Sequence, residues 1–160
     1  MSFIDHLITA MDKTLYEQDY YLWIEKTISL LENHQFSDLD LDNLIEEISD
    51  MGKSQRQSLK SYLTRLLEHL LKLVYWQSEL EYNQRGWKND IRNFRRAIKR
   101  IIADSPSLQP YLIEIFDNSF QEARISFIEL SGMAENLVSL APICTIEQGL
   151  NEDWFPEISK

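Results

Sequence analysis

The fold of this chain is decided by residues 54–74, SQRQSLKSYLTRLLEHLLKLV. Apolar residues recur along it every three or four positions, which is the spacing of a stripe on one face of an α-helix. Ser54 and Gln57 have the spacing of a capping box, so the sequence predicts that a central helix begins at this point. The stripe consists of Leu59, Leu63, Leu66, Leu67, Leu70, Leu71 and Val74.

The same helical period continues on both sides of this central helix. It predicts further helices over residues 15–31, 41–51, 87–102 and 112–137. Asp40 can cap the start of the helix over 41–51, and Gly52 can end it. Breaks between helices are expected at Gly52, Gly86, residues 105–110 and Pro142.

Helices of this length joined by short breaks predict an all-α fold. We expect one domain over residues 1–160, a bundle of about five main helices with mostly antiparallel neighbours. A capping box at Thr145 and Gln148 predicts a short C-terminal helix, and an extended tail follows it. Trp154 and Phe155 in this tail are expected to pack back onto the bundle or to contact another copy.

Charge is segregated along the chain. Residues 53–100 hold 12 of the 16 Lys and Arg against four acids, a balance of +8, whereas residues 1–52 carry −10 and residues 101–160 carry −8. The overall charge of −10 opposes sequence-independent binding to nucleic acid or anionic lipid. The basic centre is therefore either neutralised inside the chain or offered to an outside partner.

The composition is that of a folded protein, which we expect in the cytoplasm. Hydrophobic residues make up 44% of the 160 residues, and no apolar run has the length of a membrane span. Residues 1–11 include Asp5 and have neither a basic head nor an unbroken apolar run, so we expect no signal peptide or membrane anchor. Cys144 is the one cysteine, which fits a reducing compartment, and we interpret it as buried or inert.

Several motifs resemble a family found mainly in cyanobacteria and catalogued as domain of unknown function 29. The similar pieces span nearly the whole chain: residues 15–17 with Asp19 and Trp23, 39–40, 43–48, Gly52, 66–67, 69–72, Trp87, Arg95, 105–108, 123–124, 147–148 and 155–156. The chain departs from the family pattern at Ser78, Gly86, Asp90 and Phe94, which weakens any polar role around the basic helix. The resemblance implies an all-helical fold and singles out Glu46, Glu47, His69, Lys72, Trp87, Arg95 and Arg124.

Glu46, Glu47 and His69 are the candidates for chemistry. The two adjacent glutamates lie about 100° apart on a helix, so only one, Glu47 in our interpretation, can border the apolar stripe. Together with His69 it could hold a divalent metal or act as a general base. The alternatives are an interhelical ion pair for the glutamate and a hydrogen bond to a carbonyl or carboxylate for the histidine. These alternatives are favoured, and no catalytic, cofactor or metal residue is assigned.

The basic helix is the candidate site for an anion or a partner. Its cations are Arg85, Lys88, Arg92, Arg95, Arg96, Lys99 and Arg100, of which Arg92, Arg95, Arg96 and Lys99 are the candidates, with Trp87. Trp76 could add a stacking surface. Acidic residues elsewhere in the chain are available to neutralise this helix, and internal pairing is the favoured interpretation.

The function that the sequence favours is a non-enzymatic accessory or interaction protein, which binds an unknown protein partner or associates with itself. No cofactor is predicted. An enzyme that uses Glu46, Glu47 and His69, with or without a divalent metal, is the alternative, and an anion or nucleic-acid module built on the basic helix is a weaker one. The enzyme requires these side chains to converge in a pocket, whereas the interaction protein requires an exposed apolar or single-sign patch.

Overall fold

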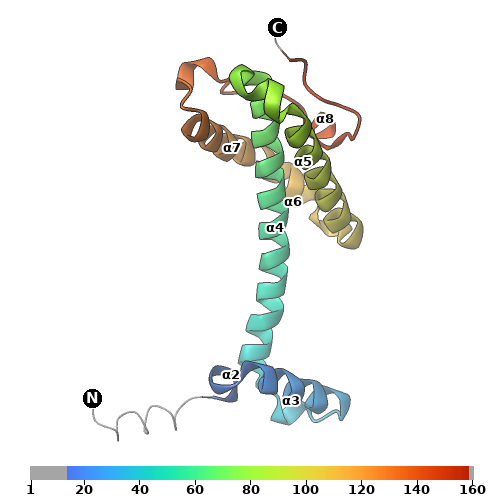
Figure 1. Cartoon of the computed structure of the whole chain (residues 1–160). Coiled ribbons are helices and arrows are strands. Elements are labelled where there is room, and N and C mark those ends of the chain that lie inside the picture. Colours follow the sequence, from blue (N-terminus) through green and yellow to red (C-terminus); the bar gives the residue numbers. More distant parts are fainter. Residues whose placement is uncertain (1–13, 159–160) are drawn as a thin grey trace, which may run out of the picture. The chain divides into compact units, whose positions relative to one another are not determined.

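The structure, a computed structural model, describes residues 14–158, so the expectation for residues 1–11 lies outside the described part. The described residues form helices and no β-strand, which confirms the predicted all-α class. The α-helices are α2 (Leu15–Gln18), α3 (Tyr20–Glu32), α4 (Leu41–Tyr75), α5 (Gln77–Asp104), α6 (Gln109–Glu114), α7 (Phe116–Ser131) and α8 (Ile146–Leu150) (Figure 1). Short 3-10 helices are η1 (Phe36–Asp38), η2 (Pro106–Leu108) and η3 (Glu135–Leu137). Among the described helices, none combines the length and the apolar character that crossing a bilayer requires.

The chain divides into two compact units. Unit 1 covers Met1–Gly52 and includes α2, α3, η1 and the first residues of α4. Unit 2 covers Lys53–Lys160 and includes the remainder of α4 and the helices from α5 to α8. Because α4 contributes residues to both units, the expectation of a single domain over residues 1–160 stays a prediction.

The helix break predicted at Gly52 is wrong, because α4 runs through it without interruption. The capping box predicted at Ser54 and Gln57 therefore lies inside a helix rather than at its start. Glycine ends a helix when it adopts a left-handed conformation, as Gly132 does after α7 with φ of 68°. Gly52 has no positive φ, and a glycine inside a helix costs only about 1 kcal/mol relative to alanine, which the flanking turns can offset.

Three other predicted helices have different boundaries. The helix expected over residues 112–137 is divided at Ile115 into α6 and α7 and ends at Ser131, because Gly132 adopts a left-handed conformation, and residues 135–137 form η3. Gly86 lies inside α5, which begins ten residues before Trp87 at Gln77. The expected helix over residues 15–31 is divided at Asp19, whose side chain caps α3 by accepting a hydrogen bond from Leu22 N at 2.9 Å. Asp19 can both end α2 and cap α3 because its backbone is not helical, with φ of −150°.

In unit 2 the long helices alternate in direction. The chain turns at Trp76, and contacts between Gln55 and Ser105, Tyr62 and Phe94, and Trp76 and Trp87 show that α5 runs antiparallel to α4. η2 and α6 then bring the chain back. α7 consequently runs in the direction of α4, as shown by the pairs Lys60–Glu122 and Glu68–Ser126.

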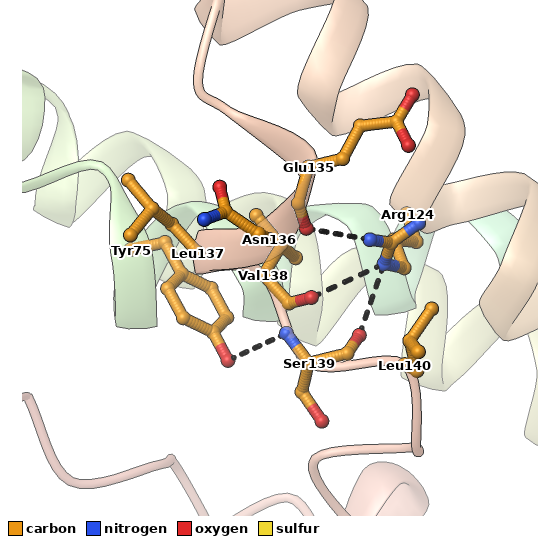
Figure 2. Close-up of a pocket in the computed structure, with 8 residues that line it drawn as sticks. All are labelled: Tyr75, Arg124, Glu135, Asn136, Leu137, Val138, Ser139 and Leu140. Carbon is orange, nitrogen blue, oxygen red and sulfur yellow. Dashed lines mark hydrogen bonds between the residues drawn. The ribbon is translucent and has the colours of Figure 1, made fainter.

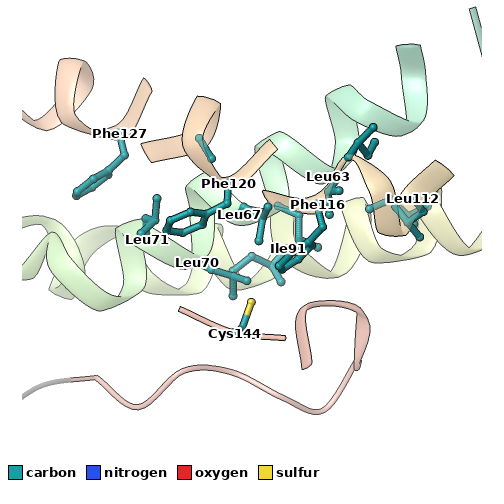
Figure 3. Packing of buried hydrophobic residues seen from close by; sticks show 14 of the residues in the cluster. Leu63, Leu67, Leu70, Leu71, Ile91, Leu112, Phe116, Phe120, Phe127 and Cys144 are labelled. Atoms are coloured by element: carbon teal, nitrogen blue, oxygen red, sulfur yellow. The ribbon is translucent and has the colours of Figure 1, made fainter. Parts of the chain in front are cut away.

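The core of unit 2 lies between these three helices (Figure 3). The second part of α4 supplies a continuous row of leucines, which pack against α5 on one side and against the aromatic residues of α7 on the other. Trp154 and Phe155 of the C-terminal tail pack on this core, as predicted, and Cys144 is buried at its edge. The side chains with no exposed surface include Leu59, Leu66, Leu67, Leu70, Leu71, Ile91, Ile98, Leu112, Phe120 and Phe127.

Candidate protein-interaction surface

Unit 1 exposes apolar side chains along the first turns of α4. Leu41 is 53% exposed, Ile45 63%, Ile48 60% and Met51 71%. Their spacing of three or four residues places them on one stripe of the helix, which we call the apolar face of unit 1. Isolated exposed apolar residues are ordinary, but a contiguous row of four large ones is typical of a binding surface.

An aromatic and carboxylate cluster fixes α4 against the N-terminal helices of unit 1. Glu47 accepts hydrogen bonds from the Tyr16 hydroxyl at 2.6 Å and the Tyr20 hydroxyl at 2.7 Å. The bond to Glu47 raises the pKa of Tyr16 to about 12, because the phenolate would face a carboxylate. The rings of both tyrosines also contact the buried Trp23. Glu47 thus orients α4 and is the more buried of the two adjacent glutamates, whereas Glu46 is exposed.

A second carboxylate completes this cluster. Asp40 accepts from the indole Nε1 of Trp23 at 3.3 Å and from the Asn43 amide at 2.8 Å. The hydrogen bond from Asn43 and that from Trp23 hold the pKa of Asp40 below its usual value. The expected capping role of Asp40 is supported by its acceptance of the Asn43 backbone N–H at 3.4 Å. The start of α4 is therefore anchored through polar contacts, while Leu41, Ile45, Ile48 and Met51 stay exposed.

The apolar face of unit 1 is surrounded by negative charge. Residues 14–52 contain ten Asp and Glu and a single Lys. Asp42 is exposed and lies about 100° around the helix from Leu41, so it borders the stripe, whereas Glu46 is exposed on the far side of the helix and adds to the negative field. This surface therefore combines apolar area with a strong field of one sign.

The candidates for chemistry have their contacts in different units. Glu47 is bound by tyrosines of unit 1, and His69 is bound inside unit 2. Its Nδ1 lies 2.9 Å from the Arg65 carbonyl oxygen, which requires a proton on Nδ1, and its Nε2 lies 3.4 Å from Asp90. Burial and the nearby Lys72 lower the pKa of His69. In the part of the chain that the structure describes, no three His, Cys, Asp or Glu side chains are grouped so as to hold a metal ion.

A partly buried ion pair lies next to His69. Lys72 Nζ is 2.9 Å from Glu68 Oε1, and Ser126 of α7 donates to the other carboxylate oxygen at 2.6 Å. Burial raises the pKa of Glu68, but the hydrogen bonds from Ser126 and Lys72 outweigh it and leave this pKa below its usual value. Glu68 therefore links α4 to α7, and Lys72, one of the residues that the family resemblance singled out, pairs with it within α4 and is buried rather than facing solvent.

The basic helix α5 is split between a buried side and an exposed one. Trp87 is buried and stacks on Trp76 at 5.9 Å between ring centroids. Lys99 pairs with Glu152 of the tail at 3.0 Å, and the guanidinium of Arg92 lies 5.2 Å from the Phe155 ring. Arg92 and Arg96 remain exposed. Lys99 of the basic helix is thus neutralised inside the chain, by the tail.

Arg95 lies inside the protein, although the sequence made it a candidate for contact with an anion or a partner. It has no exposed surface, and its guanidinium donates to the carbonyl oxygens of Gly149 at 2.7 Å, Trp154 at 2.8 Å and Glu152 at 3.4 Å. Burial lowers its pKa, and the three carbonyls compensate for the lost hydration. Arg95 follows Ile91 by four residues, so the helical period could have placed it on the buried side.

Cys144 lies beside the cluster formed by Arg95 and the backbone carbonyls that it binds, which we call the Arg95 clamp. Its thiol is buried, and burial raises its pKa to about 11, so the thiolate is scarce at neutral pH. A Cβ at Gly149 would lie only 3.6 Å from its Sγ, which shows how closely α8 approaches it. These contacts agree with the interpretation of Cys144 as a buried thiol.

Arg124 forms a second clamp of the same kind, which sequence reasoning from the residues did not find. Its Nη2 donates to the Glu135 carbonyl at 2.7 Å, and its Nε lies 3.1 Å and 3.3 Å from the carbonyls of Ser139 and Val138 (Figure 2). The Ser139 amide donates to the Tyr75 hydroxyl at 3.2 Å. These residues line an open pocket in which the Arg124 guanidinium and the Tyr75 hydroxyl have partners within the protein. Its arginine holds the loop after α7 and is engaged by the protein itself.

Comparison with known proteins gives a family for this chain. The model of the family described as "Domain of unknown function DUF29" matches residues 15–155. No curated protein matches the chain. No solved structure matches it either. The match covers both units and includes every candidate residue discussed above, so this chain belongs to the family Domain of unknown function DUF29.

Proposed function

We propose that this protein is a non-enzymatic interaction module that binds a partner protein through the apolar face of unit 1. The observation that supports it is the exposure of Leu41, Ile45, Ile48 and Met51 on one stripe of α4. Covering such a row removes apolar area from water, which is the main driving force for most protein association. The same residues have no evident structural role if the face stays uncovered.

The polar contacts of unit 1 support the same function. Glu47 and Asp40 are occupied by Tyr16, Tyr20, Trp23 and Asn43, so these carboxylates serve to orient α4. An orienting cluster of this kind presents the apolar face in a fixed direction, which lowers the entropic cost of binding a partner.

The experiment is site-specific photo-crosslinking in the cells that make the protein. A photoreactive benzoylphenylalanine replaces Ile48 in one variant and Ile125 in the control. Ile125 is a matched position, because it is 55% exposed, against 60% for Ile48, but belongs to α7 of unit 2. We expect Ile48 to yield an adduct with a second protein that Ile125 does not yield. Equal adducts at both positions, or none at Ile48, would contradict the proposal.

A further inference from the structure

The apolar face of unit 1 has the form of a surface that receives a helix. Its residues span Leu41 to Met51, a length of about 15 Å or three helical turns. A single stripe with spacings of three and four residues packs best against another helix that carries the same spacing. The complementary element is therefore an amphipathic helix of at least three turns.

The charge around the face specifies the rim of that helix. The described part of unit 1 has ten acidic side chains and one lysine, and Asp42 stands at the border of the stripe. A partner with positive charge along its apolar stripe would be drawn to this surface, whereas an acidic partner would be repelled. An anionic lipid surface would be repelled for the same reason.

A second copy of this chain does not meet both requirements. Two copies of unit 1 would bring their acidic rims together. The basic helix α5 offers cations such as Arg92 and Arg96, but its apolar side chains, Trp87, Ile91 and Ile98, are already buried in unit 2. Helix α5 therefore has positive charge but no exposed apolar stripe.

From these three steps we infer that the partner contributes a cationic amphipathic helix, which packs its apolar stripe on Leu41, Ile45, Ile48 and Met51 and places its Lys or Arg beside Asp42 and in the negative field of unit 1. This inference rests on the proposed interaction function and adds the chemistry of the partner.

The test uses the full chain and a synthetic helical peptide of leucine and lysine with one apolar stripe. Binding is measured by isothermal titration calorimetry against two control peptides. One has the same composition in an order that forms no stripe, and the other has glutamate in place of lysine. We expect the striped basic peptide to bind at least about tenfold more tightly than either, because only it satisfies both area and charge.

Variants of the protein locate the binding. Ile48→Ser is expected to weaken binding of the striped peptide by about tenfold or more, which corresponds to the loss of one buried aliphatic side chain. Ile125→Ser removes an equally exposed isoleucine from unit 2 and should leave binding unchanged. Circular dichroism verifies that both variants keep the helical content of the parent.

Four outcomes would overturn the inference. If the unstriped peptide bound as tightly as the striped one, charge alone would account for binding. Equal loss of binding in Ile48→Ser and Ile125→Ser would place the binding elsewhere. A dimer in sedimentation velocity that Ile48→Ser dissociates would make a second copy the occupant. If the peptide fails to bind while Ile48 still crosslinks to another protein in cells, the proposed interaction function stands and only the partner chemistry is wrong.

Discussion

Helix α4 carries the same apolar repeat in both units, yet the two parts have opposite environments. Between Leu59 and Leu73 the leucines of the repeat are covered by α5, α7 and the tail and have essentially no exposed surface. Between Leu41 and Met51 most of the repeat is more than half exposed. The difference teaches that periodicity predicts an amphipathic helix but not what covers its apolar side. The uncovered part is where a partner is to be sought.

The largest effect is expected when one large apolar side chain is replaced by alanine in each of the two parts of α4. Leu70→Ala, with no exposed surface in the parent, should lower the free energy of unfolding by about 2–5 kcal/mol through lost burial and a cavity. Ile48→Ala should change it by no more than about 0.5 kcal/mol, because its side chain is already largely in water.

Urea denaturation followed by circular dichroism measures both variants. A loss in Ile48→Ala as large as that in Leu70→Ala would contradict the comparison, since it would mean that the free protein covers the apolar face of unit 1.

A smaller effect is expected from releasing the tail that covers part of α4 in unit 2. Arg95→Met removes three hydrogen bonds to the carbonyls of Gly149, Glu152 and Trp154 and should let this segment open. Cys144 beside the clamp should then react with a thiol reagent at least about tenfold faster, because its low reactivity comes from burial.

The rate of thiol modification at pH 7.5 is the measurement. Arg96→Met is the matched control, since Arg96 is the exposed neighbour of Arg95 on α5. Equal reactivity in Arg95→Met and Arg96→Met would show that the tail is held by Trp154 and Phe155 without the arginine.

The helical fold could be predicted from the sequence, but the helix boundaries only in part. The spacing of apolar residues predicted the buried side of α5 and of the second part of α4, and the capping box at Thr145 and Gln148 placed α8 correctly. Gly52 and Gly86 misled because glycine does not by itself end a helix. A glycine ends one when its φ becomes positive, as at Gly132, and the sequence does not reveal φ.

The candidate surface was less predictable, for a physical reason. The sequence showed that residues 41–51 form an amphipathic helix, and the exposure of its apolar side depends on tertiary contacts. Arg95 was expected to be available to a partner because it is charged. It is buried instead, and three hydrogen bonds to backbone carbonyls replace the hydration that its guanidinium loses. Carbonyls in an extended tail carry no signal in the sequence, so no composition argument could have identified them.

The smallest expected effect is a dependence of stability on pH at His69, in the covered part of α4. Burial lowers the pKa of His69 in the folded protein, an effect that Lys72 reinforces and that the Arg65 carbonyl, Glu68 and Asp90 oppose. The unfolded chain therefore binds a proton more readily, and the stabilisation present above the unfolded pKa of about 6.5 is lost as the pH falls through the folded value. Between pH 7.5 and 5.5 we expect a loss of no more than about 1 kcal/mol. Urea denaturation at both pH values measures this loss. We expect the full loss in the parent and in the control His34→Asn, a change at an exposed histidine of unit 1. We expect a smaller loss of stability in His69→Gln. A loss of the same size in His69→Gln would assign the dependence to other groups and would leave His69 as a neutral donor to the Arg65 carbonyl at every pH tested.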